Sequence, residues 1–277
     1  MKKCRSKCSL IIGIIFMTAS LCFVLYPTVS NAVNSFFAAS TINNYAASLD
    51  SISAVDKSDR LSAAVDYNNN LSELINGFSY DTDSVIDGYD DILNFGDGLI
   101  GYIDIPKINV KLPIYHGDTD KVLEKGVAHI PNTAFPIGGI GNHSVLSAHT
   151  GYPTQVFFDN LNELSVGDEI KVSVFDETLT YAVTAKNIVQ PDNISLLSVD
   201  DEKDLLSLIT CYPYGINSHR LIVTAERVSE TASPDTAIKA RTNNNRSFDF
   251  ILLAIVAITI TAVVATFAVR KRRKNNA

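Results

Sequence analysis

A cysteine and an arginine stand on either side of a turn-rich loop, in a stretch whose pattern predicts two strands. An apolar run ends at Cys211, and a run rich in β-branched residues begins at Arg220. The loop between them contains the turn formers Pro213, Gly215 and Asn217. Such a hairpin would direct a thiol and a guanidinium into a common pocket. Because a neighbouring cation lowers the pKa of a thiol, the pair suits a cysteine nucleophile.

A cysteine nucleophile also needs a group that moves protons, and His149 is the histidine best placed to provide it. His149 follows the apolar run 144–148 and precedes a segment with Gly151 and Pro153, so it also stands where a predicted strand gives way to a loop. Cysteine, histidine and arginine at equivalent strand ends predict nucleophilic catalysis by the cysteine. Arg220 would donate hydrogen bonds to a carbonyl oxygen on which negative charge develops, or would hold the substrate backbone. The alternative is a rim residue that solvates the end of the strand.

The remaining four histidines lack such a setting. His116 and His129 are interpreted as structural or surface residues, since neither has an acidic or thiol neighbour in the sequence. His143 precedes His149 by six residues, which is about 20 Å along a strand. His219 would point away from the face that its neighbour Arg220 occupies.

Cysteine usage separates Cys211 from the others. Cys4, Cys8 and Cys22 lie in the first hydrophobic run or before it, and Cys211 is the only cysteine that follows. A single exported cysteine forms no internal disulfide, so it is either a buried apolar residue or a free reactive thiol. No His, Cys, Asp and Glu residues have metal-ligand spacing, and the sequence predicts neither a metal nor a cofactor.

Two hydrophobic runs predict membrane segments. Residues 9–26 follow a basic tail, 1–8, which is typical of a signal anchor or of a signal peptide cleaved after the small residues 30–32. Residues 248–269 form a longer run that a second basic tail, 270–277, follows. Since basic flanks stay in the cytoplasm, we expect both tails to be cytoplasmic and the part between the runs to lie on the extracellular face of the cell membrane. The formal net charge of −7 then lies mostly on the exported part, which does not favour nucleic-acid binding.

The exported part divides into three segments with different residue patterns. Residues 27–98 predict a helical stalk: loosely helical spacing from 34 to 76 indicates one or two helices, and the acidic, turn-rich stretch 77–98 indicates a solvated linker. Its aspartates lack the spacing of a calcium-binding EF-hand loop. Residues 99–228 alternate short apolar runs with turn formers, which predicts an all-β barrel or sandwich. Residues 229–247 are a polar linker.

The all-β part is expected to contain eight strands and one short helix. A short helix is expected over 157–164, where apolar residues have helical spacing. The expected strands are 99–103, 110–113, 126–128, 143–148, 169–175, 178–188, 204–211 and 220–228.

Three stretches carry a resemblance to a known family. Residues 208–211 read Leu-Ile-Thr-Cys, 211–221 read Cys-Tyr-Pro-Tyr-Gly-Ile-Asn-Ser-His-Arg-Leu, and 146–153 read Leu-Ser-Ala-His-Thr-Gly-Tyr-Pro. Together with 102–108 and 112–117 they resemble sortases, the cysteine transpeptidases of Gram-positive cell surfaces, and more closely the class C, pilin-polymerising branch. The resemblance covers residues 99–228 and implies a closed, sortase-type β-barrel of about eight strands, preceded by a helical region and flanked by membrane segments.

The same resemblance implies the reaction and the partners. Cys211 would be the nucleophile, His149 the general acid and base, and Arg220 the group that stabilises the oxyanion and the substrate. The substrate would be an exported pilin or surface protein with a Leu-Pro-x-Thr-Gly-like sorting signal, cleaved between Thr and Gly. The acceptor would be an amine, either a pilin lysine or a cell-wall peptide. A non-catalytic surface scaffold is the more distant alternative.

One departure from the family pattern concerns the lid. Class C sortases carry an Asp-Pro-aromatic motif ahead of the barrel that plugs the active site, and this sequence has no such triplet. The acidic stretch from Tyr80 to Asp90 lies where the lid is expected, and the presence of a lid stays an open question.

Overall fold

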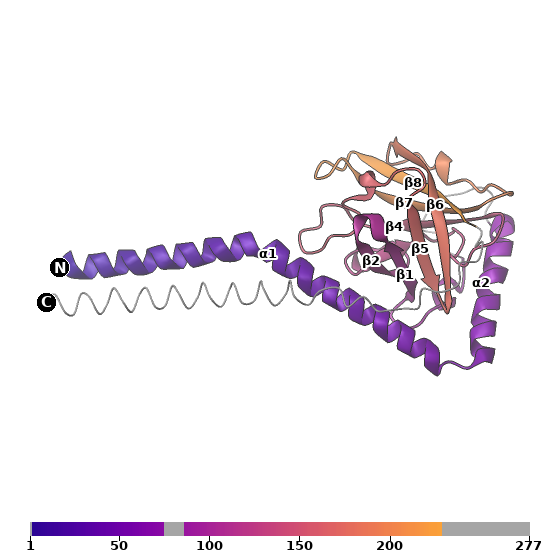
Figure 1. Ribbon diagram of the computed structural model, residues 1–277, viewed down its shortest axis with the longest axis horizontal. Helices are drawn as coiled ribbons and strands as arrows, with labels where there is room; N and C mark the ends of the chain where they lie inside the picture. Colours follow the sequence, from indigo (N-terminus) through magenta and orange to yellow (C-terminus); the bar gives the residue numbers. More distant parts are fainter. Residues whose placement is uncertain (1, 75–85, 229–277) are drawn as a thin grey trace. The chain divides into compact units, whose positions relative to one another are not determined.

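The computed structural model describes the backbone of residues 2–74 and 86–228 (Figure 1). Three predicted segments of the C-terminal part, 229–247, 248–269 and 270–277, lie outside the described residues, as do residues 75–85, which include the first half of the stretch where a lid is expected. The described chain belongs to two compact units, and the second of them begins at Asn34. The barrel lies in this second unit.

The N-terminal hydrophobic run lies within one long helix, α1, which spans Lys2–Ser51. In the part of the chain that the structure describes, it is the one helix that is long and apolar enough to cross a membrane. The run 9–26 and the first of the helices expected after it are therefore one continuous element, which passes through Pro27. A second helix, α2, follows as Ala54–Leu74.

Both helices bury one stripe against the barrel. Residues of α1 buried in the second unit are spaced by three or four positions, namely Ala38, Ile42, Tyr45 and Leu49. The buried residues Ala64, Tyr67 and Leu71 of α2 have the same helical spacing. The helices expected from 34 to 76 are thus present, and they form part of the hydrophobic core.

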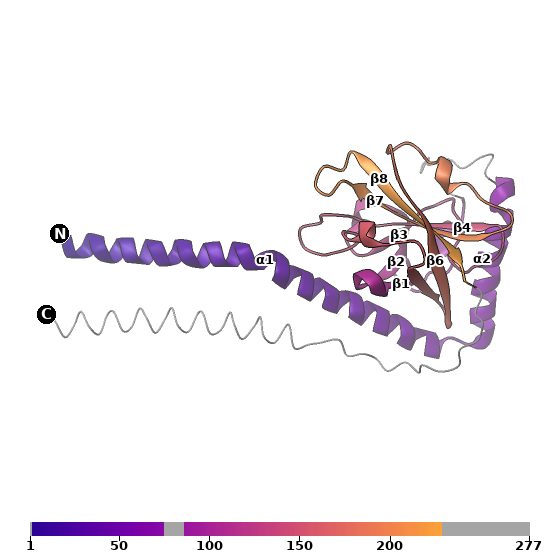
Figure 2. The ribbon, with the colours of Figure 1, turned by 45° about the horizontal axis from the view of Figure 1, so that its top comes forward.

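Eight strands close into a barrel, as the resemblance implied (Figures 1 and 2). Their order around the barrel is β1-β2-β3-β4-β7-β8-β6-β5, and β2–β3 and β4–β7 are parallel pairs. The strands are β1 Leu99–Ile105, β2 Val110–His116, β3 Val127–His129, β4 Asn142–Ser147, β5 Glu169–Val174, β6 Glu177–Val189, β7 Asp204–Tyr212 and β8 His219–Arg227. Each expected strand coincides with one of these. One turn of 3₁₀ helix, η4 Leu161–Glu163, stands within the range 157–164.

Alternation along β7 and β8 decides which side chains face the barrel interior. Leu206 and Leu208 of β7 pack in the main core, together with Leu221 and Val223 of β8. Because successive strand residues point to opposite faces, the residues between them lie on the outer face of the barrel wall. Ile209 and Ile222 accordingly belong to a separate apolar cluster.

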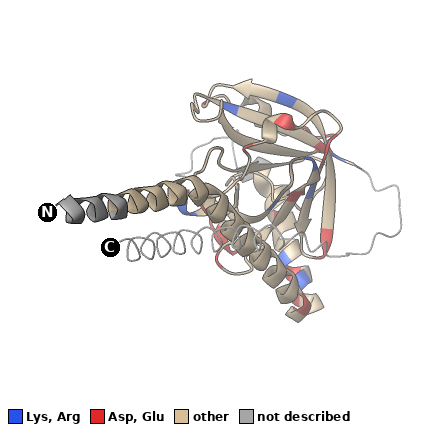
Figure 3. Cartoon of the chain, turned by 60° about the vertical axis from the view of Figure 1, so that its left-hand side comes forward, with Lys and Arg blue, Asp and Glu red and all other residues tan. Residues whose placement is uncertain are grey.

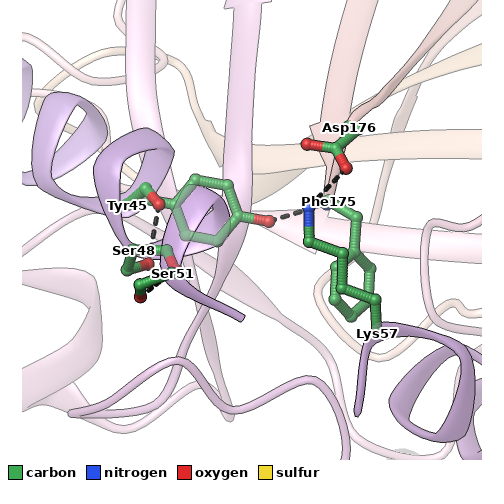
Figure 4. Close-up of polar contacts among 6 residues, drawn as sticks. All are labelled: Tyr45, Ser48, Ser51, Lys57, Phe175 and Asp176. Carbon is green, nitrogen blue, oxygen red and sulfur yellow. Dashed lines mark hydrogen bonds and ion pairs between the residues drawn. The ribbon is translucent and has the colours of Figure 1, made fainter. Parts of the chain in front are cut away.

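The corner between α1 and α2 is bonded to the turn between β5 and β6 (Figure 4). The backbone N–H of Phe175 donates to the Tyr45 hydroxyl at 2.8 Å, and Lys57 Nζ lies 2.6 Å from a carboxylate oxygen of Asp176. The Tyr45 hydroxyl in turn donates to the carbonyl of Ile100 on β1, and burial raises the pKa of Tyr45. In the strand order β1 lies across the barrel from β7, so this bonded corner holds the wall opposite to β7.

The expectation of a solvated linker is wrong for residues 86–98. Its aspartates are exposed, but Tyr89 is 2% exposed and Leu93 is 0% exposed. Tyr89 begins a turn of 3₁₀ helix, η2 Tyr89–Asp91, and its hydroxyl lies 2.8 Å from Nδ1 of His129. The apolar side chains between the aspartates enter the core, and this burial outweighs the acidic composition of the stretch.

His116 and His129 are structural residues that fasten this segment. His116 Nε2 lies 2.6 Å from the carbonyl of Ile92 and Nδ1 lies 2.8 Å from that of Gly98. The ring of His129 stacks on Phe135 with a centroid distance of 4.7 Å. Because the imidazole is fully buried, desolvation lowers the pKa of His129 to about 3, and the ring is neutral in the folded protein at neutral pH.

Candidate active site

Cys211 and Arg220 face each other directly across the ladder of β7 and β8. Residues directly opposite in an antiparallel pair have side chains on the same face of the sheet. Two positions along the same ladder, Ile209 is paired with Ile222, and both isoleucines lie on the outer face. Cys211 and Arg220 therefore share the outer face of the wall, where both are partly exposed.

His149 reaches this row from β4, which runs parallel to β7. The register pairs Ser147 with Ile209, and the N–H of Ala148 donates to the carbonyl of Ile209 at 3.1 Å. The Thr210 hydroxyl donates to the carbonyl of Ala148 at 2.8 Å, so β4 stays beside β7 one residue past its last paired position. The same register, continued two residues, sets His149 level with Cys211. All three candidate residues thus stand at the same end of three adjacent strands, β4, β7 and β8.

The loop that follows His149 carries two aromatic rings against the imidazole. Tyr152 stacks on His149 with a centroid distance of 5.2 Å and an interplanar angle of 2°. Phe157 meets the imidazole with its edge at 6.3 Å and 68°. Sequence reasoning did not assign a role to either ring. The signal available was the presence of aromatic residues within one short loop after a candidate histidine.

Arg220 is turned toward its own loop. Its Nη1 donates to the carbonyl of His219 at 3.1 Å and to that of Asn217 at 3.4 Å. The ring of His219 contacts Ser218 and Gln190 instead, so the two neighbouring side chains have different partners, as the alternation predicts. The other guanidinium N–H groups of Arg220 are the donors that a substrate carbonyl would use.

Two loops border the site. The ring of Tyr214, which is 65% exposed in the loop between β7 and β8, lies over Gly151 in the loop after β4. Gly151 has φ +71°, and a Cβ there would stand 3.4 Å from that ring. A side chain at this position would touch the ring without a clash, but its backbone would be strained, because left-handed backbone favours glycine.

A buried apolar cluster lies beside the site along the outer wall. It consists of Ile130, Val145, Leu197, Ile209 and Ile222, and residues of the loop between β6 and β7 pack over it. His143 helps to hold this loop, because its Nδ1 lies 2.9 Å from the carbonyl of Ser198 and its Nε2 lies 2.9 Å from the Ser207 hydroxyl. Burial lowers the pKa of His143. His143 lies on the same face of β4 as His149, but its ring bonds to Ser198 and Ser207. This agrees with the prediction that it lies too far along the strand to act with His149.

Two pockets among the described residues lie away from the candidate residues. One, of about 320 Å³, lies between α2 and the β5–β6 hairpin, and the other, of about 230 Å³, lies beside Asn142 at the opposite end of β4. Within the described ranges, no three His, Cys, Asp or Glu side chains are grouped so that they could hold a metal ion. Charges of both signs are scattered over the barrel in the view of Figure 3. Of these features, the Cys211 face alone combines a thiol, an imidazole and a guanidinium.

Comparisons with known proteins agree on one family. A model of the sortase domain matches residues 103–228. Sortase D of Bacillus subtilis (strain 168) is 34% identical over 132 residues, which are 47% of this chain and 64% of that protein. The match thus spans slightly less than two thirds of that curated relative.

Solved structures match over a larger share. Sortase C1 from Streptococcus agalactiae superposes with a TM-score of 0.61 at 36% identity, over 68% of this chain and 98% of that one. Clostridium perfringens sortase C, solved with the C-terminal cell wall sorting motif, gives a TM-score of 0.61 at 38% identity, over 69% of this chain and 100% of that one. Both are class C enzymes by name. The chain therefore belongs to the sortase family, and its structural neighbours are class C sortases.

Proposed function

We propose that this protein is a membrane-anchored cysteine transpeptidase that cleaves a Leu-Pro-x-Thr-Gly-like sorting signal between Thr and Gly and transfers the acyl group to an amine. The observation that carries the proposal is the direct pairing of Cys211 with Arg220 across β7 and β8, with His149 level with them on β4. The sorting motif in the Clostridium perfringens structure supports this substrate class.

The first half of the reaction is acylation of Cys211. The thiolate sulfur attacks the threonine carbonyl carbon, a carbon–sulfur bond forms, and Arg220 donates hydrogen bonds to the oxygen that becomes negative. The bond between that carbon and the glycine nitrogen then breaks. His149, protonated, gives its proton to the departing glycine amine, which leaves a thioester on Cys211 and a neutral imidazole.

The second half returns the enzyme to its starting state. The acceptor amine attacks the thioester carbonyl and gives a proton to His149, and the sulfur leaves as thiolate. The product is a new amide bond. We propose a pilin lysine as the acceptor, which makes the product an isopeptide bond in a pilus, on the basis of the class C neighbours. Transfer to a cell-wall peptide is the alternative, and the two differ only in the acceptor.

The proposed location follows from α1 and from the basic tails. The apolar part of α1 would anchor the chain in the cell membrane, with the barrel on the extracellular face and both tails in the cytoplasm. Residues 99–228 would form the catalytic domain, 27–98 a helical stalk, and 248–269 a second membrane span.

The test uses the full chain in detergent micelles with a fluorogenic sorting-signal peptide. Cys211→Ala is expected to abolish cleavage. His149→Ala is expected to lower kcat about 10²- to 10⁴-fold because it removes the proton donor, and Arg220→Lys to lower it about 10²- to 10³-fold. Cys22→Ala is the matched control, since this cysteine is exposed on α1, and it should cleave like the parent.

Acceptor preference is read from the same reaction by mass spectrometry. A lysine-bearing pilin peptide and a cell-wall branch peptide, supplied together, separate the two acceptors by the mass of the product. Cleavage by Cys211→Ala at the rate of the parent would falsify the assignment of the nucleophile and with it the proposed reaction.

A further inference from the structure

The imidazole of His149 is held in a cluster of three rings. Tyr152 lies parallel to it at 5.2 Å, Phe157 meets it edge-on at 6.3 Å, and Tyr152 and Phe157 meet each other at 5.8 Å and 68°. Phe157 is fully buried in the main core, so its ring is a fixed wall. Centroid distances and angles of this kind are those of favourable aromatic pairs.

The loop that carries these rings is closed by Asp159. One carboxylate oxygen accepts the N–H of Gly151 at 2.9 Å, and the other accepts the N–H of Phe157 at 2.9 Å. The N–H of Phe158 donates to the carbonyl of His149 at 3.0 Å. Both ends of the segment 151–157 are therefore tied to one half-buried carboxylate, and this brings Tyr152 and Phe157 together.

The backbone alone does not set the orientation of the imidazole. The second side-chain torsion of histidine has broad minima, so a ring without contacts samples a wide range of angles. A general acid and base must have its nitrogen within about 2.6–3.2 Å of the atom that exchanges the proton. The parallel ring of Tyr152 against the imidazole, backed by the fixed ring of Phe157 that contacts both, restricts the imidazole to one plane.

We propose that Tyr152 is a positioning residue that orients the His149 imidazole for proton transfer through the face of its phenol ring, with Asp159 holding the loop in the shape that makes the stack possible. This inference rests on the proposed role of His149 as general acid and base. Tyr152 acts through His149 and exchanges no proton with the substrate.

The first experiment separates the ring face from the hydroxyl of Tyr152. Tyr152→Leu removes the flat partner and keeps an apolar side chain, and it is expected to lower kcat about tenfold with little change in KM, because misplacement of a reacting group acts on the transition state. Tyr152→Phe keeps the stack and should restore most of the rate. The matched control is Tyr102→Leu, which removes a partly exposed tyrosine from β1.

A second measurement reports the stack without any turnover. In full chain labelled with ¹³C-histidine, the ring proton signal of His149, assigned with His149→Gln, should move downfield in Tyr152→Leu and stay in place in Tyr152→Phe. Asp159→Asn weakens the loop closure at both N–H groups and should shift the same signal and lower kcat in the same direction. These readouts do not depend on global stability, which circular dichroism follows separately.

The outcomes distinguish this inference from the proposed function. If His149→Ala cleaves like the parent, the proposed reaction is wrong. If His149→Ala is inactive while Tyr152→Leu retains the kcat of the parent, the reaction stands and the positioning role is refuted. A loss in Tyr152→Phe as large as in Tyr152→Leu also refutes it, because the hydroxyl and not the ring face would then matter.

Discussion

The buried, neutral imidazole of His129 makes the stability of the barrel depend on pH. Its pKa is lowered from 6.5 to about 3, and desolvation by complete burial is the largest cause. Between these two values the unfolded chain binds a proton that the folded chain excludes. The stabilisation is therefore fully present above pH 6.5 and is lost as the pH falls through this window toward 3.

The magnitude follows from the linkage relation. One proton bound only by the unfolded state lowers the free energy of unfolding by about 1.4 kcal/mol for each pH unit below 6.5. At pH 5 this amounts to about 2 kcal/mol, which is a large share of the 5–15 kcal/mol that is typical of a folded domain. His143 contributes in the same direction, since burial lowers its pKa too.

The assay compares two proteins so that other titrating groups cancel. Urea unfolding of the full chain in detergent is followed by circular dichroism between pH 7 and pH 5, for the parent and for His129→Asn. The variant loses the stack on Phe135 and is expected to be less stable throughout, but its free energy of unfolding should fall less steeply as the pH drops. The contribution of His129 to the pH dependence is the difference between the two slopes of free energy of unfolding against pH. The constant offset between the two curves does not report it.

Parallel curves for the two proteins would refute the reasoning, since they would mean that His129 titrates alike in the folded and unfolded chain. If the variant does not fold, the parent still decides the question. The NMR signal of the His129 ring should keep its neutral chemical shift from pH 7 to pH 5, and a titration within that range would contradict the burial argument.

Two further predictions concern stability. Leu93 is 0% exposed, so Leu93→Ala is expected to lower the free energy of unfolding by about 2–5 kcal/mol in a urea titration. The control Leu196→Ala, at a residue that is 39% exposed, should change it by less than about 1 kcal/mol. Equal losses in the two variants would show that residues 86–98 are not part of the core. Lys57→Ala breaks the ion pair with Asp176, whose side chain is 66% exposed, and should lower the free energy of unfolding by less than about 1 kcal/mol. Because salt screens exposed charges, the difference from the parent should shrink in 1 M NaCl. A loss that does not respond to salt would mean that the lysine stem, and not its charge, stabilises the corner.

The sequence by itself determined the strands and one half of the site. Alternation and turn formers act over a few residues, so all eight strands could be placed within a few positions. Cys211 and Arg220 belong to one hairpin, and its strand–loop–strand pattern was enough to predict that both face a common pocket; their direct pairing is a finding of the structure. The prediction from composition was wrong for residues 86–98. Residues 77–98 contain six aspartates, which indicated a solvated linker, but a smaller number of apolar residues between them is buried in the core.

Only the tertiary structure decided which wall carries the site and what surrounds it. His149 comes to Cys211 through the parallel pairing of β4 with β7, across a separation of 62 residues at the Thr210 to Ala148 hydrogen bond. The contact of Tyr152 with the imidazole, and the placing of the three candidate residues on the outer face, also depend on how the barrel closes. Local sequence patterns carry the periodicity of a strand but not the identity of its neighbour, because pairing between distant segments is selected by the packing of the whole core.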